Sequence, residues 1–175
     1  DFDSLLSLSL AKNEFSGEIP EELGNLQNLE RLYLYNNALT GEIKQSLENL
    51  EKLQIFDFSD NQLSGSIPQW IGNLSDLELF RIDNNQFSGD IPLSIFTNLS
   101  FLKQLTLNNN MLTGNMPDQI SNMPQLWLFR RNPRQAFLLH ISQTSIPAQN
   151  LLSFSRCLLG EEPDQPLEEL KLFDS

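Results

Sequence analysis

The sequence predicts an α/β solenoid, in which short coils stack against one another and share a single core. One motif of 15 residues recurs along the chain, as LERLYLYNNALTGEI at residues 29–43 and as LQIFDFSDNQLSGSI at residues 53–67. Its last asparagine returns at Asn13, Asn37, Asn61, Asn85 and Asn110, in steps of 24, 24, 24 and 25 residues. Because a unit of this size cannot bury its apolar side alone, a constant period in the twenties indicates stacked coils.

Each motif begins with a predicted strand. In Leu32-Tyr33-Leu34 the alternation directs the two leucines inward and the tyrosine outward. Such strands bury their leucines only if consecutive coils pair, so we expect one parallel sheet on the concave side of the solenoid. The convex side is expected to hold short helical or irregular turns.

The five marker asparagines are predicted to hold the coils together after each strand. The chain turns away from the sheet at this point and leaves backbone N–H and C=O groups that no neighbouring strand satisfies. An asparagine side chain offers two donors and an acceptor, so one asparagine per coil forms a ladder. We therefore expect all five to be buried, stacked and bonded to backbone.

The second half of the motif returns the chain to the next coil. Ser-Gly-x-Ile-Pro occurs at residues 16–20, 64–68 and 88–92, where glycine permits a backbone conformation that other residues avoid and proline fixes the bend. The fourth coil is one residue longer. The spacing of its leucines places the extra residue between Leu93 and Asn98, on the convex side and away from the strands.

These motifs resemble those of a known family. The combination of L-x-x-L-x-L-x-x-N with S-G-x-I-P and with L-G-N-L, as at residues 23–26, is similar to the plant-type leucine-rich repeat of receptor-like kinase ectodomains, receptor-like proteins and polygalacturonase inhibitors. The likeness covers Leu5 to Phe129 with five repeats and the start of a sixth. It implies a right-handed leucine-rich-repeat horseshoe.

The resemblance also implies a function and a compartment. Such a protein would recognise a protein or peptide ligand through its concave face, without catalysis, as part of a receptor-like ectodomain that is extracellular or at the cell surface. Two alternatives stay open: a secreted inhibitor of a cell-wall hydrolase resembling the polygalacturonase inhibitors, and a structural assembly subunit.

The chain divides into two predicted parts. Residues 1–129 form the repeats, and residues 130–175 form an irregular C-terminal segment that ends in a repeat-like strand at residues 167–172. This segment is interpreted as a degenerate cap, as an insert resembling the islands of some plant receptors, or as a sequence that is not a natural continuation. The single cysteine, Cys157, provides no internal disulfide, whereas family members usually carry paired cysteines in caps. We therefore expect further repeats, a co-receptor or a neighbouring subunit to cover the ends.

Composition excludes several classes of function. The formal net charge of −12 argues against nucleic acid or an anionic membrane as the partner, and no apolar run is long enough to span a membrane. No His/Cys cluster has the spacing of a metal site, so neither a metal nor another cofactor is predicted. His140 and Cys157 are the one pair available for nucleophilic catalysis, and they are 17 positions apart in the irregular segment. The chain is accordingly predicted not to be an enzyme.

Two sequons bear on the compartment. Asn73-Leu74-Ser75 and Asn98-Leu99-Ser100 both have the form N-x-S without proline, and both fall on the predicted convex return. We expect Asn73 and Asn98 to be glycosylated if the protein is secreted. The alternative is that the repeat itself places an asparagine there.

The candidate binding surface is the concave face. Residues between the two strand leucines form one outward column, namely Ser9, Tyr33, Asp57, Arg81 and Thr106. Two more columns follow it along the strands. Because neighbouring strands are about 4.8 Å apart, a predicted ligand-binding patch spans three strands. It contains Tyr33, Tyr35, Asp57, Asp60, Arg81 and Asp83. Tyrosine and arginine are the residue types that interfaces favour, although a solvated face with a neutralised arginine is the alternative.

Overall fold

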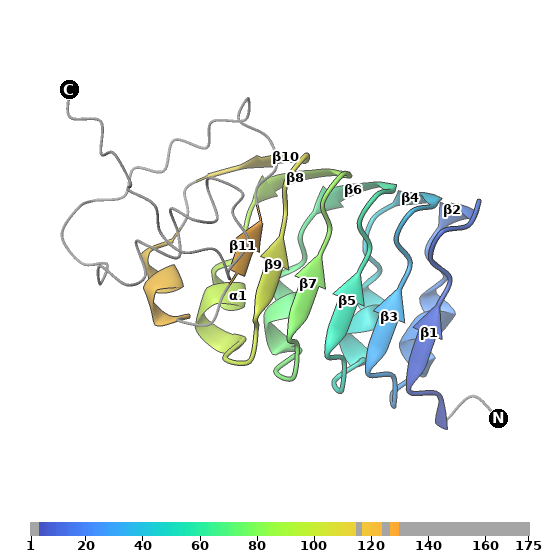
Figure 1. The fold of residues 1–175 in the computed structure, drawn as a ribbon, viewed down its shortest axis with the longest axis horizontal. Coiled ribbons are helices and arrows are strands. Elements are labelled where there is room, and N and C mark those ends of the chain that lie inside the picture. The colour runs from blue at the N-terminus through green and yellow to red at the C-terminus, as the bar shows by residue number, and fades with distance from the viewer. Residues whose placement is uncertain (1–3, 115–116, 124–126, 130–175) are drawn as a thin grey trace, which may run out of the picture.

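The computed structural model describes residues 4–114, 117–123 and 127–129. Two parallel sheets run along the stack of coils, and short helices lie on the side opposite the first sheet (Figure 1). The first sheet has the order β1-β3-β5-β7-β9-β11, and the second has the order β10-β8-β6-β4-β2. Consecutive coils are therefore neighbours in both sheets, as a solenoid requires.

The elements of each coil are short. The first sheet consists of β1 (Ser7–Ser9), β3 (Arg31–Tyr33), β5 (Ile55–Asp57), β7 (Leu79–Arg81), β9 (Gln104–Thr106) and β11 (Trp127–Phe129). The second consists of β2 (Ser16–Glu18), β4 (Ala38–Gly41), β6 (Gln62–Ser66), β8 (Gln86–Asp90) and β10 (Met111–Thr113). The helices are the 3-10 helices η2 (Glu21–Asn25), η3 (Gln45–Asn49), η4 (Gln69–Asn73) and η5 (Asp118–Asn122), and the α-helix α1 (Leu93–Asn98).

The first sheet confirms the predicted strands and their register. Leu32 pairs with Phe56, and Phe56 pairs with Phe80, so the inward residues of successive coils lie side by side. All three are fully buried. The predicted outward column is also in register, because Tyr33 pairs with Asp57 and Asp57 with Arg81.

The second sheet was not predicted. The Ser-Gly segment was interpreted as part of the bend that returns the chain to the next coil, yet it lies within strands, with Gly65 at φ 82° in β6 and Gly89 at φ 76° in β8. The constant period explains this result. Identical bends repeat in every coil, so the backbone groups on both sides of the glycine face those of the neighbouring coil and pair with them.

The convex side holds the predicted short helices. Four coils have 3-10 helices of five residues, whereas the fourth has the six-residue α-helix α1. The longer helix takes up the extra residue between Leu93 and Asn98. The register of β7 with β9 is undisturbed, with Phe80 opposite Leu105. The predicted placement of the extra residue is therefore confirmed.

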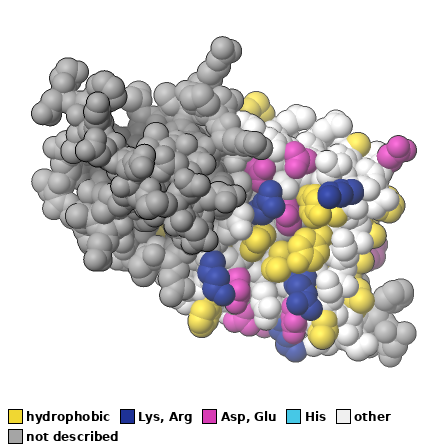
Figure 2. All heavy atoms as spheres, in the orientation of Figure 1, with side chains coloured by type: hydrophobic (Ala, Val, Ile, Leu, Met, Phe, Trp, Pro, Cys, Tyr) yellow, Lys and Arg dark blue, Asp and Glu magenta, His cyan; other side chains and the backbone are white. Residues whose placement is uncertain are grey.

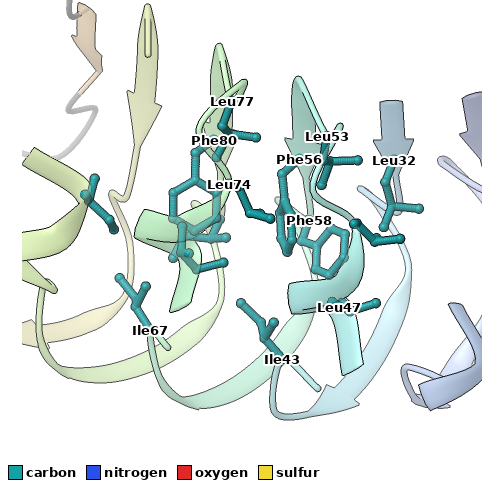
Figure 3. Packing of buried hydrophobic residues seen from close by; sticks show 14 of the residues in the cluster. Leu32, Ile43, Leu47, Leu53, Phe56, Phe58, Ile67, Leu74, Leu77 and Phe80 are labelled. Carbon is teal, nitrogen blue, oxygen red and sulfur yellow. The ribbon is translucent and has the colours of Figure 1, made fainter. Parts of the chain in front are cut away.

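The core runs the length of the coils and is richest in aromatic rings around β5 and β7. Phe56, Phe58 and Phe80 lie close together between the strands and the helices (Figure 3). The ring centroids of Phe56 and Phe58 are 4.1 Å apart, and those of Phe56 and Phe80 are 5.3 Å apart. The helices η4 and α1 approach each other so closely that a Cβ added at Gly72 would overlap Ser94 of α1.

The asparagine ladder is present. Four asparagines form it: Asn37, Asn61, Asn85 and Asn110. The Nδ2 of each donates to carbonyls of its own coil and of the preceding coil. The Oδ1 of each accepts a hydrogen bond from a backbone N–H of the preceding coil. The expected burial was wrong for most of them. Asn110 is buried, three are half-buried, and Asn13 is exposed.

Asn13 differs because it belongs to the first described coil. Its Nδ2 donates to Leu10 and Ala11 of the same coil. In the described residues, no earlier coil supplies the carbonyl and the N–H that each later asparagine uses. Each later asparagine thus links its coil to the preceding coil, and Asn13, in the first described coil, forms no such link there.

Candidate ligand-binding surface

The strands of the first sheet present the predicted patch on one face. Tyr33, Asp57 and Arg81 are the last residues of β3, β5 and β7 and lie opposite one another in register. Tyr35 and Asp83 each follow two positions later, so strand alternation directs them to the same face. All of the predicted residues therefore belong to three neighbouring coils.

Arg81 lies between two buried carboxylates. Its Nη1 is 3.4 Å from Asp57 Oδ2, and its Nε is 3.7 Å from Asp83 Oδ1. The two aspartate side chains are 6% and 8% exposed, whereas the arginine side chain is 34% exposed. The guanidinium thus compensates two carboxylates beneath it and shows its outer part to solvent.

Asp57 is also fixed by its own coil. Its Oδ1 accepts hydrogen bonds from the Ser59 backbone N–H at 3.2 Å and from Ser59 Oγ at 2.7 Å. Both residues are buried. Asp57 therefore shapes the turn after β5 and positions Arg81, and little of its surface is left for a ligand.

Asp83 has an unusual electrostatic environment. Burial raises the pKa of Asp83, and the nearby carboxylates of Asp60 and Asp57 raise it further, while the positive charge of Arg81 lowers it. The raised pKa shows that burial and the neighbouring carboxylates outweigh the effect of the single arginine. Burial of the carboxylate is the largest of these effects.

Asp60 lies in the turn after β5 and is exposed. Its φ is 53°, and the equivalent residue of each described coil from the first to the fifth is also left-handed: Lys12, Asn36, Asn84 and Asn109. Asn84 Nδ2 donates to Asp60 Oδ1 at 2.7 Å and to Asp83 Oδ2 at 3.2 Å. Asn84 thereby connects the two aspartates. This left-handed column was not predicted from the sequence, although its asparagines were the available signal.

The two tyrosines form the adjoining part of the patch. Their ring centroids are 6.4 Å apart at an interplanar angle of 81°, an edge-to-face contact between Tyr33 and Tyr35. Lys12 Nζ lies 5.9 Å from the centre of the Tyr35 ring. Both tyrosines are half-buried. They offer rigid aromatic surface next to the charged residues.

Two apolar residues of this face were missed. Ile55 and Leu79 begin β5 and β7, pair with each other, and are half-buried, whereas the next residue of each strand is fully buried. Alternation puts them on the same face as Asp57 and Arg81. Figure 2 shows this face, with hydrophobic side chains gathered over β3 and β5 and charged side chains around them. An apolar residue at an outward strand position was the overlooked signal.

The other predicted sites lie elsewhere. Asn73 and Asn98 end η4 and α1 and are exposed, on the side opposite the first sheet. His140, Cys157 and the whole of the predicted segment 130–175, including 167–172, lie outside the described residues. Within the described residues, no group of three or more His, Cys, Asp or Glu side chains could hold a metal ion. No helix in that part of the chain is long and apolar enough to cross a membrane.

Comparisons with known proteins identify the repeat. Sequence models of the leucine-rich repeat match residues 27–87 and residues 4–26 and 101–123. No curated protein matches the chain.

Solved structures are similar over the repeats. The PEPR1–AtPEP1 complex is 38% identical with a TM-score of 0.71, and the match covers 74% of this chain and 18% of that chain. The Arabidopsis receptor kinase HAESA, solved with the peptide hormone IDA and the co-receptor SERK1, is 35% identical with a TM-score of 0.66. The match covers 73% of this chain and 21% of that chain. The BIR3–SERK2 complex from Arabidopsis thaliana is 32% identical with a TM-score of 0.65, covering 71% and 70%.

This chain therefore spans about a fifth of the length of the first two matched proteins. The chain belongs to the leucine-rich-repeat family, in the form found in plant receptor-kinase ectodomains.

Proposed function

We propose that the chain is part of a receptor-like ectodomain, outside the cell or at its surface, and that it recognises a peptide or protein ligand on the concave face. The observation that carries this proposal is the composition of that face. Tyr33, Tyr35, Ile55 and Leu79 bring half-exposed aromatic and aliphatic surface around the fixed guanidinium of Arg81. Rigid aromatic anchors next to directional charged groups are typical of binding hot spots.

The solved relatives support the class of ligand. HAESA is solved with a peptide hormone and a co-receptor, and PEPR1 with AtPEP1. The convex side has a different use in this proposal. Asn73 and Asn98 are exposed there, and a glycan on either would leave the concave face free.

The end of the stack at β1 is proposed to pack against a further coil or a partner subunit. Strands β1 and β2 are the edges of the two sheets. Leu6 and Phe15 are 48% and 47% exposed in this coil, and among the described residues Asn13 bonds only to carbonyls of its own coil. A coil of the same type would cover the apolar surface and complete the ladder.

A selection experiment tests the binding face. The full chain is used to select binders from a random 12-residue peptide library, and the affinity of each selected peptide is then measured by fluorescence anisotropy. Truncating a hot-spot tyrosine costs about 2 kcal/mol, so Tyr33→Ala should weaken these peptides by roughly thirtyfold.

The matched control is Phe101→Ala, which removes an aromatic side chain that is 60% exposed in the turn between α1 and β9. It should leave the affinity unchanged. Peptides that bind equally well to Tyr33→Ala, or that depend on Phe101 instead, would contradict the proposed face.

A further inference from the structure

The charges of the concave patch do not balance. The guanidinium of Arg81 faces the carboxylates of Asp57 and Asp83, and a third carboxylate, that of Asp60, is connected to Asp83 through Asn84. Two other cations lie on this face in the first two coils: Lys12 lies over the ring of Tyr35, and Arg31, exposed at the start of β3, lies opposite Ile55 at the other end of the strands from Asp60. The whole chain carries a formal net charge of −12, so no long-range positive field offsets this local excess.

The positive charge of Arg81 is already compensated by neighbouring carboxylates, so it attracts an acidic ligand only weakly. Its Nη1 and Nε face Asp57 and Asp83, and each of these carboxylates is more than nine-tenths buried. An acidic or phosphorylated ligand group would approach a guanidinium that is already compensated and would meet the carboxylate of Asp60 beside it. Like charges at that separation disfavour binding.

A hydrogen-bond donor is missing at the same place. Asp83 Oδ1 is buried and accepts no hydrogen bond, and Arg81 Nε, 3.7 Å away, donates none. Asp83 Oδ2 is bonded to Asn84, which also bonds Asp60. Asp60 and Asp83 thus both accept hydrogen bonds from Asn84, and of these two aspartates Asp60 is exposed.

We propose that the ligand is an extended peptide segment with a basic side chain, arginine or lysine, that binds at Asp60 beside Asp83, and with an apolar side chain that packs on Tyr33, Ile55 and Leu79. This inference rests on the proposed function and specifies its ligand. The basic group restores the charge balance of the patch. The apolar group covers the half-exposed surface that sequence analysis missed.

Asp60→Asn is the decisive variant, because it removes the charge and keeps the shape. Asparagine tolerates the left-handed backbone at φ 53° and retains the oxygen that accepts the bond from Asn84. Glu22→Gln is the matched control: it makes the same change of charge on an exposed residue of η2, on the opposite side of the coil.

The probes are the selected peptides that depend on Tyr33, synthesised with arginine and with its neutral isostere citrulline, or with lysine and acetyl-lysine. Partly exposed ion pairs are worth up to about 1 kcal/mol, so the neutral peptide should bind wild type about fivefold more weakly. Asp60→Asn should weaken the charged peptide to a similar extent and should abolish the difference between the two peptides. Glu22→Gln should retain that difference.

Each other outcome overturns a defined part of the account. If Tyr33-dependent peptides carry no essential basic residue, the basic-ligand inference fails while the concave face stands. If Asp60→Asn and Glu22→Gln weaken binding equally, the attraction is long-range and the site at Asp60 is wrong. If no selected peptide depends on Tyr33, the proposed function fails as well.

Discussion

Asn61→Ala tests the ladder that joins the coils. Asn61 Nδ2 donates to Leu34 at 3.0 Å, to Phe58 at 3.3 Å and to Ser59 at 3.1 Å, and its Oδ1 accepts from the Leu39 N–H at 3.0 Å. Alanine removes all four bonds at once.

The loss of stability follows from the hydrogen bonds that each partner of Asn61 keeps in the variant. The carbonyl of Leu34 still accepts from Asn37, that of Phe58 from Asn85, and that of Ser59 from the Asn36 N–H. The Leu39 N–H loses its acceptor, Asn61 Oδ1, and Leu39 is only 6% exposed. One unsatisfied buried donor costs about 1 to 3 kcal/mol, so Asn61→Ala should lower the free energy of unfolding by about 2 kcal/mol.

Urea denaturation measures this change, with the slope of the transition unchanged if the unfolded state is the same. Asn13→Ala is the matched control, because Asn13 bonds only to carbonyls of its own coil among the described residues and is exposed. It should cost less than about 0.5 kcal/mol. Equal effects of the two variants, or a loss below about 0.5 kcal/mol for Asn61→Ala, would refute the inter-coil ladder.

Three further predictions concern stability. Gly72→Ala should destabilise the chain by about 1 to 3 kcal/mol in urea denaturation, because the added Cβ would overlap α1, and a change near zero would contradict the close helix contact. Lys44→Pro also removes the ion pair of Lys44 with Glu18, so it is made in a Glu18→Ala background, where it should raise the free energy of unfolding by about 0.4 to 1 kcal/mol, since φ is −70° there and other coils have proline at this position; a loss relative to Glu18→Ala would argue against it. Burial raises the pKa of Asp83 from 3.8, so the folded chain binds this proton more tightly than the unfolded chain, and wild-type stability contains a term that falls as pH rises through the folded pKa. Asp83→Asn removes this pH-dependent contribution, so the melting temperature of the variant relative to wild type should increase as pH is raised from below 3.8 through the folded pKa; a relative decrease would reverse the assigned direction.

The backbone architecture was largely predictable because the repeat constrains it many times over. A single alternation such as Leu32-Tyr33-Leu34 is weak, but five copies at a constant period determine strands, register and the side that faces the core. The length of the fourth coil was predictable for the same reason. Its leucine spacing changes by one residue, and α1 accommodates the change.

The second sheet was not predictable from residue preferences. Glycine weakens an isolated strand, and the motif around Gly65 has the composition of a turn. The strands there depend on pairing between identical bends of neighbouring coils, which no local preference describes. The exposure of Asn13 depends likewise on the stack, since its residue type and spacing match those of the buried Asn110.

The candidate surface was predictable in position and less so in the role of each residue. Alternation identified the face and brought Asp57 next to Arg81. It did not reveal that the Asp57 side chain is nearly buried and bonded to Ser59, which makes it a positioning residue for Arg81. Replacing Arg81 would leave buried carboxylates uncompensated and lower stability, so Tyr33 is the better probe of binding.

Hydroxyl-radical footprinting of the full chain, with and without a selected peptide, tests the central claim that the concave face binds the ligand. Tyr33 and Tyr35 report on the patch, while Phe101 and Met111 are 60% and 58% exposed and report on surface away from it. We expect the peptide to lower oxidation of both tyrosines and to leave that of Phe101 and Met111 unchanged. Unchanged oxidation of the tyrosines with protection of Phe101, Met111 or residues 130–175 would contradict it.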